Sequence, residues 1–376
     1  MDTKKFRTRQ EFNMLSLPKG KDYIVALDVG YSGTKVFYET GYACFPSYAK
    51  LLDDHMMNVP DHKDIIYRND ETGDTYLVGY NAQNMADGSN DTDSELYSRK
   101  RYTDPRFRII CYTAIGIAAM KKTDDRKIII QTGLPASYLN DAVSLRKAIT
   151  EMPKFSLKIG AQKEWISFDI KIDSGNIFVM PQPMGALYST IIYNNGSFTK
   201  DAMSMLKGSV MVLDAGFGTF DFYGIKDRHV DCQDSIDDIS MRQVFIKTTQ
   251  NILNEFGEEI RVPALQKNLS TGYVTCIDEE DMGSCDKDFS NLLERANNEV
   301  FEAAKVKIRS ATNAFRGYQY VIVDGGTGEA WFEKICDWLS NMKTLQILPS
   351  NINDKLPFIY SNARGYYMFR YTNNKK

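Results

Sequence analysis

The stretch Ala26–Lys35, ALDVGYSGTK, follows the apolar run Tyr23–Val25 and combines an aspartate, two glycines, a threonine and a lysine. The apolar run indicates a buried strand, and the glycine-rich end indicates a tight turn. Glycine has no Cβ and tolerates positive φ, so backbone N–H groups in such a turn can approach a phosphate closely. The stretch is therefore either an ordinary strand with its turn or a loop that holds phosphate.

A second copy of this pattern lies about half a chain away. Leu27–Tyr38 reads LDVGYSGTKVFY and Leu213–Tyr223 reads LDAGFGTFDFY, and a gap of one residue aligns the aspartate, both glycines, the threonine and the closing aromatics. Each copy follows an apolar run, so each is predicted to be a hairpin with its glycines at the tip. The repeat favours two related domains that share a cleft, and chance similarity is the alternative.

Strand and helix patterns alternate around both copies, which predicts an α/β chain with mixed sheets. The expected elements are a helix over Arg106–Lys122, a strand over Lys127–Leu134, helices over Asp141–Met152, Ile239–Phe256 and Asp288–Ala314, and a strand, glycine turn and helix within Tyr318–Ile335.

Composition restricts the partners and the compartment. The chain has 376 residues and a net charge of −3, so direct DNA binding driven by overall charge is not expected. Its six cysteines include no C-x-x-C pair, which fits reduced thiols in the cytosol. The longest near-apolar run, Ile109–Met120, is shorter than the ~18 residues of a membrane span. We expect a soluble, cytoplasmic protein without direct membrane contact.

The two hairpin tips carry residue types that suit a nucleoside triphosphate. Asp28 and Asp214 would lie on opposite sides of the bound phosphates, and two carboxylates suit a hydrated Mg²⁺. Lys35 would offset charge on the outer phosphates. The standard P-loop is absent from the sequence, so phosphate binding would use the hairpins.

Five segments, taken in order, resemble motifs of the actin-like ATPase superfamily. LDVGYSGTK resembles its first phosphate motif, LDAGFGTFDF its second, and IVDGGTGEAW its adenosine motif. MPQPMGALY and YSNARGYYMF resemble its two connecting helices. The resemblance implies a duplicated, ribonuclease H-like fold of two domains with a nucleotide cleft between them. The implied division is a polar extension over 1–20, domain I over 21–182 plus 346–376, and domain II over 183–345.

Within that superfamily, CFPSYAK (Cys44–Lys50) and IQTGLPASYLN (Ile130–Asn140) resemble the plasmid-segregating bacterial actins of the ParM type and their archaeal relatives. The resemblance implies an ATPase, or GTPase, that assembles into dynamic filaments, with hydrolysis in the filament as a disassembly timer. It also implies a DNA-binding, ParR-like adaptor that links the filament to a plasmid centromere.

The resemblance also assigns roles to single residues. The catalytic set is Asp28, Lys35, Gln182 and Asp214; Asp28 and Asp214 hold Mg²⁺ through water, and Gln182 orients the attacking water. Pro183 requires a helix to begin at that point. The implied nucleotide-binding residues are Gly30, Ser32, Gly33 and Thr34 in the first tip, Gly216, Gly218 and Thr219 in the second, and Gly325, Gly326, Thr327 and Gly328 in the adenosine turn.

Four interpretations of the sequence stay open. A small-molecule kinase of the same superfamily is the alternative function, and it would need an acceptor pocket with a catalytic carboxylate. Asp221 suits either the metal shell or a turn contact. The basic stretch 99–108 suits DNA phosphate, a solvated face or a filament contact. Residues 1–20 contain no recognisable motif, and we expect them to be loosely ordered.

Overall fold

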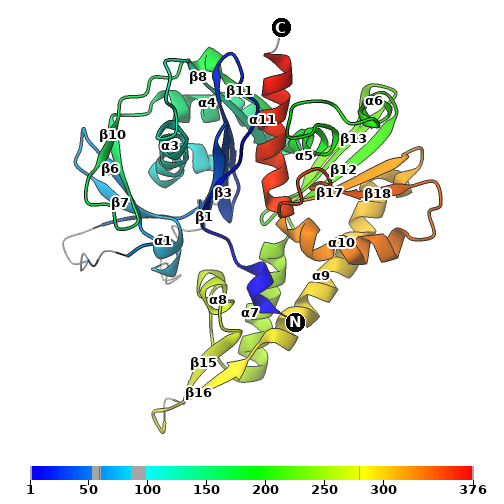
Figure 1. The fold of residues 1–376 in the computed structure, drawn as a ribbon. Helices are drawn as coiled ribbons and strands as arrows, with labels where there is room; N and C mark the ends of the chain where they lie inside the picture. Colours follow the sequence, from blue (N-terminus) through cyan, green and yellow to red (C-terminus); the bar gives the residue numbers. More distant parts are fainter. Residues whose placement is uncertain (1, 53–58, 60, 86–98, 279, 375–376) are drawn as a thin grey trace.

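The computed structural model describes residues 2–52, 59, 61–85, 99–278 and 280–374. Figure 1 shows two bodies side by side, each built around a sheet, with helix α11 (Ser361–Asn373) running between them. We call the body that contains β2 domain I and the body that contains β12 domain II.

Domain I is built on a six-stranded sheet in which the predicted first hairpin is central. Its strand order is β1 (Glu11–Met14), β4 (Gly41–Pro46), β3 (Gly33–Tyr38), β2 (Tyr23–Val29), β8 (Ile128–Leu134) and β11 (Ile177–Pro181). The strands β2, β3 and β4 are antiparallel, whereas β2, β8 and β11 are parallel. Alternate residues of β2 pack on α3 (Pro105–Ala119) and on α11, so β2 is buried on both faces.

Domain II repeats this arrangement. Its sheet has the order β14 (His229–Ile236), β13 (Phe220–Lys226), β12 (Ser209–Ala215), β17 (Tyr320–Asp324) and β18 (Gln346–Pro349), again with three antiparallel strands followed by parallel ones. The helices α7 (Met241–Phe256), α9 (Ser290–Ala311) and α10 (Gly326–Leu339) share one core with this sheet. The helix α5 (Gln182–Ile191) covers its other face. The shared strand order supports the predicted duplication of a ribonuclease H-like unit.

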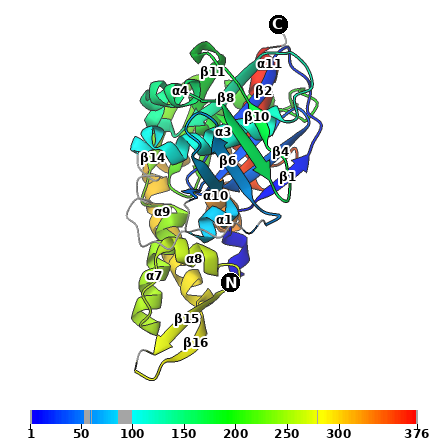
Figure 2. The same cartoon turned by 90° about the vertical axis from the view of Figure 1, so that its left-hand side faces the viewer.

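The strands β10, β9, β6, β7 and β5 form a further sheet, and β15 and β16 form a separate hairpin that projects from one end of the molecule (Figure 2). No helix among the described residues is both long and apolar enough to span a membrane. The remaining elements are η1 (Thr3–Phe6), β5 (Ala49–Leu51), β6 (Ile65–Asn69), β7 (Thr75–Val78), α1 (Tyr80–Asn84), η2 (Arg99–Thr103), η3 (Ala136–Asp141), α4 (Ala142–Thr150), β9 (Phe155–Ile159), β10 (Ile166–Phe168), η4 (Ser174–Asn176), α6 (Ala202–Lys207), α8 (Val262–Asn268), β15 (Tyr273–Asp278), β16 (Gly283–Asp288), η5 (Asn313–Phe315) and η6 (Phe358–Tyr360).

The predicted helices and strands are confirmed, with ends shifted by a few residues. The expectation of a loosely ordered N-terminus is wrong. The strand β1 pairs antiparallel with β4, from Glu11 opposite Cys44 to Met14 opposite Gly41. The backbone hydrogen bonds to β4 hold this segment as a strand, although its sequence lacks the apolar pattern that would have identified one.

The helices α5 and α11 cross where the two domains join. At the crossing, a Cβ on Gly185 would lie 2.7 Å from the Cα atom of Asn362, and a Cβ on Gly365 would lie 2.6 Å from the carbonyl carbon of Gly185. Both distances are shorter than van der Waals contact, so this approach of two backbones requires glycine in both helices.

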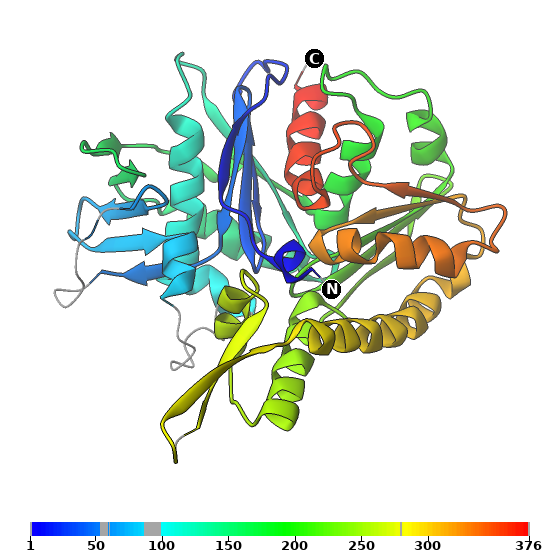
Figure 3. The same ribbon diagram turned by 60° about the horizontal axis from the view of Figure 1, so that its bottom comes forward.

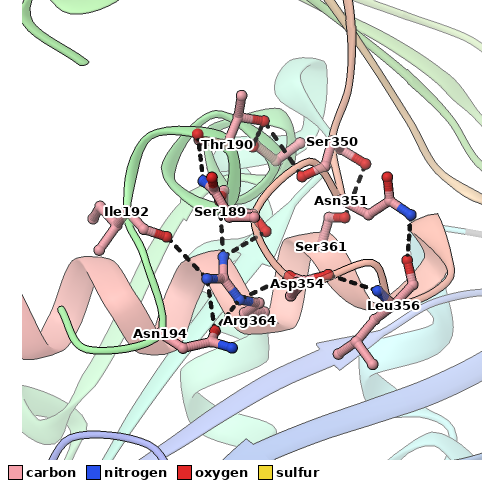
Figure 4. A network of polar contacts seen from close by, with 12 residues as sticks. Ser189, Thr190, Ile192, Asn194, Ser350, Asn351, Asp354, Leu356, Ser361 and Arg364 are labelled. Carbon is pink, nitrogen blue, oxygen red and sulfur yellow. Dashed lines mark hydrogen bonds and ion pairs between the residues drawn. The ribbon is translucent and has the colours of Figure 1, made fainter. Parts of the chain in front are cut away.

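A buried polar network fixes α11 beyond this crossing (Figure 4). The side chain of Arg364 is fully buried, and its Nε lies 2.8 Å from an Asp354 carboxylate oxygen. The guanidinium also donates to the carbonyl oxygens of Ser189 at 2.8 Å and Ile192 at 2.9 Å. The network therefore ties α11 to the end of α5 and to the loop before η6.

Candidate functional site

The two predicted hairpins are present, and their tips have the same geometry. Asp28 lies opposite Lys35 in the first hairpin, and Asp214 lies opposite Asp221 in the second. The N–H of Gly30 donates to the carbonyl of Gly33 at 3.1 Å, and the N–H of Gly216 donates to the carbonyl of Thr219 at 2.9 Å.

The gap introduced in the sequence comparison is therefore wrong within the hairpins. The matched register superposes the tips without a gap, so that Thr219 corresponds to Gly33 rather than to Thr34, and Asp221 corresponds to Lys35. The shared G-T pair favoured the gap, but backbone pairing fixes the register.

The two tips face each other. A Cβ on Gly218 would lie 2.9 Å from ring atoms of Tyr31, so the aromatic residue of the first tip packs directly on a glycine of the second. The guanidinium of Arg101 lies over the Tyr31 ring, 4.5 Å from its centroid. Tyr31 therefore occupies the space that a side chain at Gly218 would need.

In the first hairpin, the Nζ atom of Lys35 lies 3.0 Å from Asp28. Burial is the largest single influence and lowers the pKa of Lys35, but the attraction and hydrogen bond of Asp28, together with Cys44 and Asp214, leave this pKa raised. Ser47 supports the same tip, because its hydroxyl donates to the carbonyl of Gly30 at 2.8 Å and lies 2.8 Å from the Thr34 hydroxyl. The lysine charge is thus held at the tip.

In the second hairpin, three carboxylates lie side by side on neighbouring strands. Asp214 is in register with Asp221 on β13 and with Asp324 on β17. Burial, with the neighbouring Asp324 and Asp221, raises the pKa of Asp214 well above its usual range. Burial also raises the pKa of Asp324 to about 7, against the hydrogen bond that Ser350 donates at 2.6 Å.

Two of these carboxylates keep buried oxygens without a hydrogen-bond partner among the described residues, Oδ1 of Asp214 and Oδ2 of Asp324. The hydroxyl of Tyr366 is a third such atom. Asn362 donates to the other oxygen of Asp214 at 2.8 Å. Buried acceptors without donors suit a bound cation or its water shell.

The hydrogen bonds of Asp221 are those of a residue with a structural role. It is buried and accepts hydrogen bonds from Thr219 at 2.9 Å, from the Ser235 hydroxyl and from the N–H of Ala136 at 3.2 Å. Ala136 belongs to η3, beside the domain I sheet, so Asp221 links the second hairpin to the other domain. Burial raises its pKa to about 6, against these hydrogen bonds.

The glycine turn at Gly325–Gly328, which resembles the adenosine motif, lies beside the second tip. Gly325 has φ of +83°, and a Cβ there would lie 2.6 Å from the carbonyl carbon of Ala215, so both conformation and space require glycine. The hydroxyl of Thr327 donates to the carbonyl of Gly216 at 2.6 Å. This bond joins the start of α10 to the second hairpin.

Gln182 begins α5, and Pro183 lies in its first turn, as the sequence required. A cavity of about 810 Å³ lies between the domains, and Gln182 lines it together with Asp28, Lys35 and Asp214. Thr34 and Gly328 lie behind the cavity surface, whereas these predicted binding residues line it: Gly30, Ser32, Gly33, Gly216, Gly218, Thr219, Gly325, Gly326 and Thr327.

The sequence prediction missed part of the cavity lining. Tyr31 and Phe217 held matching aromatic positions in the repeat, and that match could have identified them. Several other lining residues carry no such signal, among them Lys5, Phe6, Arg7, Thr8 and Arg9 from the N-terminal segment, Arg101, and Met241, Glu294, Glu329, Phe332 and Phe358 from domain II and the segment before α11.

The described arginines of the basic stretch 99–108 are either buried or held in ion pairs. Arg101 is 6% exposed and stacks on the rings of Tyr31 and Phe107. Arg106 pairs with Asp104 at 2.7 Å, and Arg108 pairs with Glu151 at 2.8 Å. The side chains of Arg99 and Lys100 lie outside the described residues. For Arg101, the interpretation as a DNA, solvent or filament contact is wrong, because the side chain is buried at the cavity.

Comparisons with known proteins agree with this architecture. Residues 26–185 match the family described as actin like proteins N terminal domain. The chain is similar to ParM from the 15-stranded filament of Clostridium botulinum, at 19% identity and a TM-score of 0.70, over 93% of this chain and 98% of that one. No curated protein matches the sequence significantly.

Two further solved structures are similar. The apo psk41 ParM protein is 16% identical, with a TM-score of 0.61 over 92% of this chain and 96% of that one. An archaeal actin homologue in complex with ADP is 19% identical, with a TM-score of 0.58 over 92% of this chain and 97% of that one. Residues 26–185 therefore match the actin-like N-terminal domain family, and the chain as a whole has the fold of the ParM structures.

Proposed function

We propose that this protein binds ATP, or GTP, with Mg²⁺ in the cavity between its domains and assembles into filaments in the cytoplasm. Hydrolysis in the filament would act as a timer for disassembly. The observation that carries the proposal is the pair of glycine tips with matching strand register and hydrogen bonding, which pack on each other and line one cavity of about 810 Å³. Such tips offer backbone N–H groups to phosphate from both sides.

Arg101 supports an anionic ligand. Its guanidinium is buried at the cavity, forms no ion pair with a carboxylate among the described residues, and has an Nε atom without a hydrogen-bond partner. A buried cation without a counter-charge is costly, and a phosphate in the cavity would reduce that cost.

The carboxylates support Mg²⁺. Asp28 and Asp214 line the cavity, and the free Oδ1 of Asp214 can accept a hydrogen bond from metal-bound water. The bound ion would offset charge on the phosphates. Gln182 is a poor proton acceptor, so it would position the attacking water rather than deprotonate it, and hydrolysis would be slow.

The proposal of filament assembly rests on the similar filament structures, and the proposal of DNA segregation rests on the sequence resemblance to plasmid-segregating actins. The ParM structure of Clostridium botulinum is a filament, and the same fold over nearly the whole chain supports self-assembly here. Segregation of plasmid DNA would use a separate ParR-like adaptor, because the net charge of −3 favours no direct DNA binding.

Sedimentation and light scattering with Mg²⁺ and ATP or GTP test the proposal, together with a phosphate-release assay. We expect nucleotide-dependent polymer that disassembles as phosphate is released. Turnover without assembly at any protein concentration, with phosphorylation of a sugar or acid, would support the small-molecule kinase instead.

Two variants test the assigned roles. Asp214→Ala and Gln182→Ala should slow hydrolysis and lengthen filament lifetime. The exposed residues of the same types, Asp173→Ala and Gln162→Ala, are matched controls and should behave as the wild type. Unchanged turnover in both test variants would refute the roles.

A further inference from the structure

The N-terminal segment lines the cavity and contacts both domains. Figure 3 shows η1 between the domain I sheet and helix α10. The segment leaves domain I at β1, where Glu11–Met14 extends the sheet, and reaches domain II at Thr3. Residues 3–10, which we call the strap, are therefore attached to both domains.

The domain II end of the strap is fixed by one buried hydrogen bond and one apolar side chain. The hydroxyl of Thr3 donates to the carbonyl of Leu269 at 2.9 Å, and Thr3 is buried. The ring of Phe6 is partly buried against the hydrophobic core of domain II. Because the strap is attached to domain I at β1, this hydrogen bond can form only when domain II lies within reach of the strap.

The middle of the strap is fixed to domain I. Arg7 donates to the Tyr80 hydroxyl at 2.6 Å, and Gln10 accepts from the N–H of Tyr80 at 2.7 Å and donates to the carbonyl of Lys63 at 2.6 Å. Thr8 packs on the first phosphate tip, where a Cβ on Gly33 would lie 3.0 Å from its methyl group.

The strap adds positive charge to the cavity. Lys5, Arg7 and Arg9 all line it. Neither Lys5 nor Arg9 forms an ion pair with a described residue, whereas Lys35, the lysine of the first tip, is already paired with Asp28. Lys5 and Arg9 are thus the cations of the strap that are available to an anionic ligand.

We propose that the strap closes over the bound nucleotide, with Lys5 and Arg9 contacting it, so that the nucleotide cannot leave until the strap detaches from domain II. This inference rests on the proposed nucleotide site. The strap is a lid rather than a plug, because the cavity keeps about 810 Å³ with the strap in its place. Of the two cations, Arg9 lies close enough to Glu329, at the start of α10, to lower the pKa of that carboxyl, which burial otherwise raises.

The test is the dissociation rate of a fluorescent nucleotide, mant-ADP, from the full chain, measured by stopped flow. Lys5→Gln and Arg9→Gln should each raise the dissociation rate about tenfold, the usual size of one charge-assisted hydrogen bond. Phe6→Ala, which loosens the domain II end, should also speed dissociation. Lys4→Gln is the matched control, because Lys4 is exposed, neighbours Lys5 and does not line the cavity.

The possible outcomes distinguish a failure of the strap proposal from a failure of the proposed nucleotide site. If wild-type protein does not bind mant-ADP, the nucleotide site itself is wrong. If wild-type protein binds and all three strap variants release it at the wild-type rate, the strap is wrong and the site stands. Slower release or tighter binding in the variants would show that the strap opposes the nucleotide, which also overturns the inference.

Discussion

Removing one partner of the buried Arg364–Asp354 pair should destabilise the protein strongly. The two side chains are 0% and 3% exposed and lie 2.8 Å apart. Burial lowers the pKa of Arg364 and raises the pKa of Asp354, with each partner opposing the shift of the other. Both shifts show that loss of hydration outweighs the mutual attraction, so the pair itself contributes little net stability.

The cost lies in leaving one charge alone. In Asp354→Asn the guanidinium keeps its neutral acceptors but no counter-charge, and in Arg364→Met the carboxylate keeps only the N–H of Leu356, at 2.8 Å. We expect each single variant to lower the free energy of unfolding by about 3–5 kcal/mol. The double variant carries no buried charge, so it should cost no more than either single variant, a coupling of about 3 kcal/mol.

Urea unfolding of the nucleotide-free protein, followed by circular dichroism, measures these free energies. The exposed pair Lys247–Glu299, with a 3.0 Å separation, provides the control. Glu299→Gln should cost less than about 1 kcal/mol. The reasoning is refuted if Asp354→Asn costs no more than this control, or if the double variant costs the sum of the two singles.

Three further predictions follow from the site and the helix crossing. Gly365→Ala should lower stability by about 1–3 kcal/mol in thermal unfolding, because its Cβ would lie 2.6 Å from the carbonyl carbon of Gly185; Gly175→Ala, with no atom within 4 Å, should change little. Arg101→Met should weaken ATP binding at least about tenfold by calorimetry, and equal affinity would remove Arg101 from the site. Because burial raises the pKa of Asp221 to about 6, its protonation stabilises the fold fully below about pH 4, and this stability is lost as the pH rises through 6. The melting temperature of nucleotide-free protein should therefore fall between pH 5 and 7, and Asp221→Asn should reduce that fall; an unchanged slope would contradict it.

Local chemistry made the hairpins predictable. Apolar runs that end in Asp and Gly indicate strands with tight tips, and both tips formed where β2 and β12 end. The four residues to which the resemblance assigns catalytic roles line one cavity for the same reason, since each lies next to such a tip or at the first turn of α5.

The strap and Arg101 could not be predicted, because long-range contacts place them. The strap is a polar segment whose Thr3 bonds to Leu269, far along the chain, and no local pattern encodes that contact. A basic run usually marks a solvated face, but the Arg101 guanidinium is buried against aromatic rings that other elements bring to it. The alignment of the two hairpins was wrong for a similar reason, because the shared G-T pair favoured a gap that the backbone pairing does not allow.

The contact between Gly185 and Gly365 has a mechanical consequence. No side chain lies between the two backbones at that point, so no flexible spacer can absorb a change in the angle between α5 and α11. A rotation of one helix against the other at this contact would therefore rotate the two domains relative to each other. The hairpin β15–β16 projects at the far end of domain II, as Figure 2 shows, so it lies far from the contact between the two helices. A few degrees of rotation would move that hairpin much farther than the two glycine turns beside the crossing.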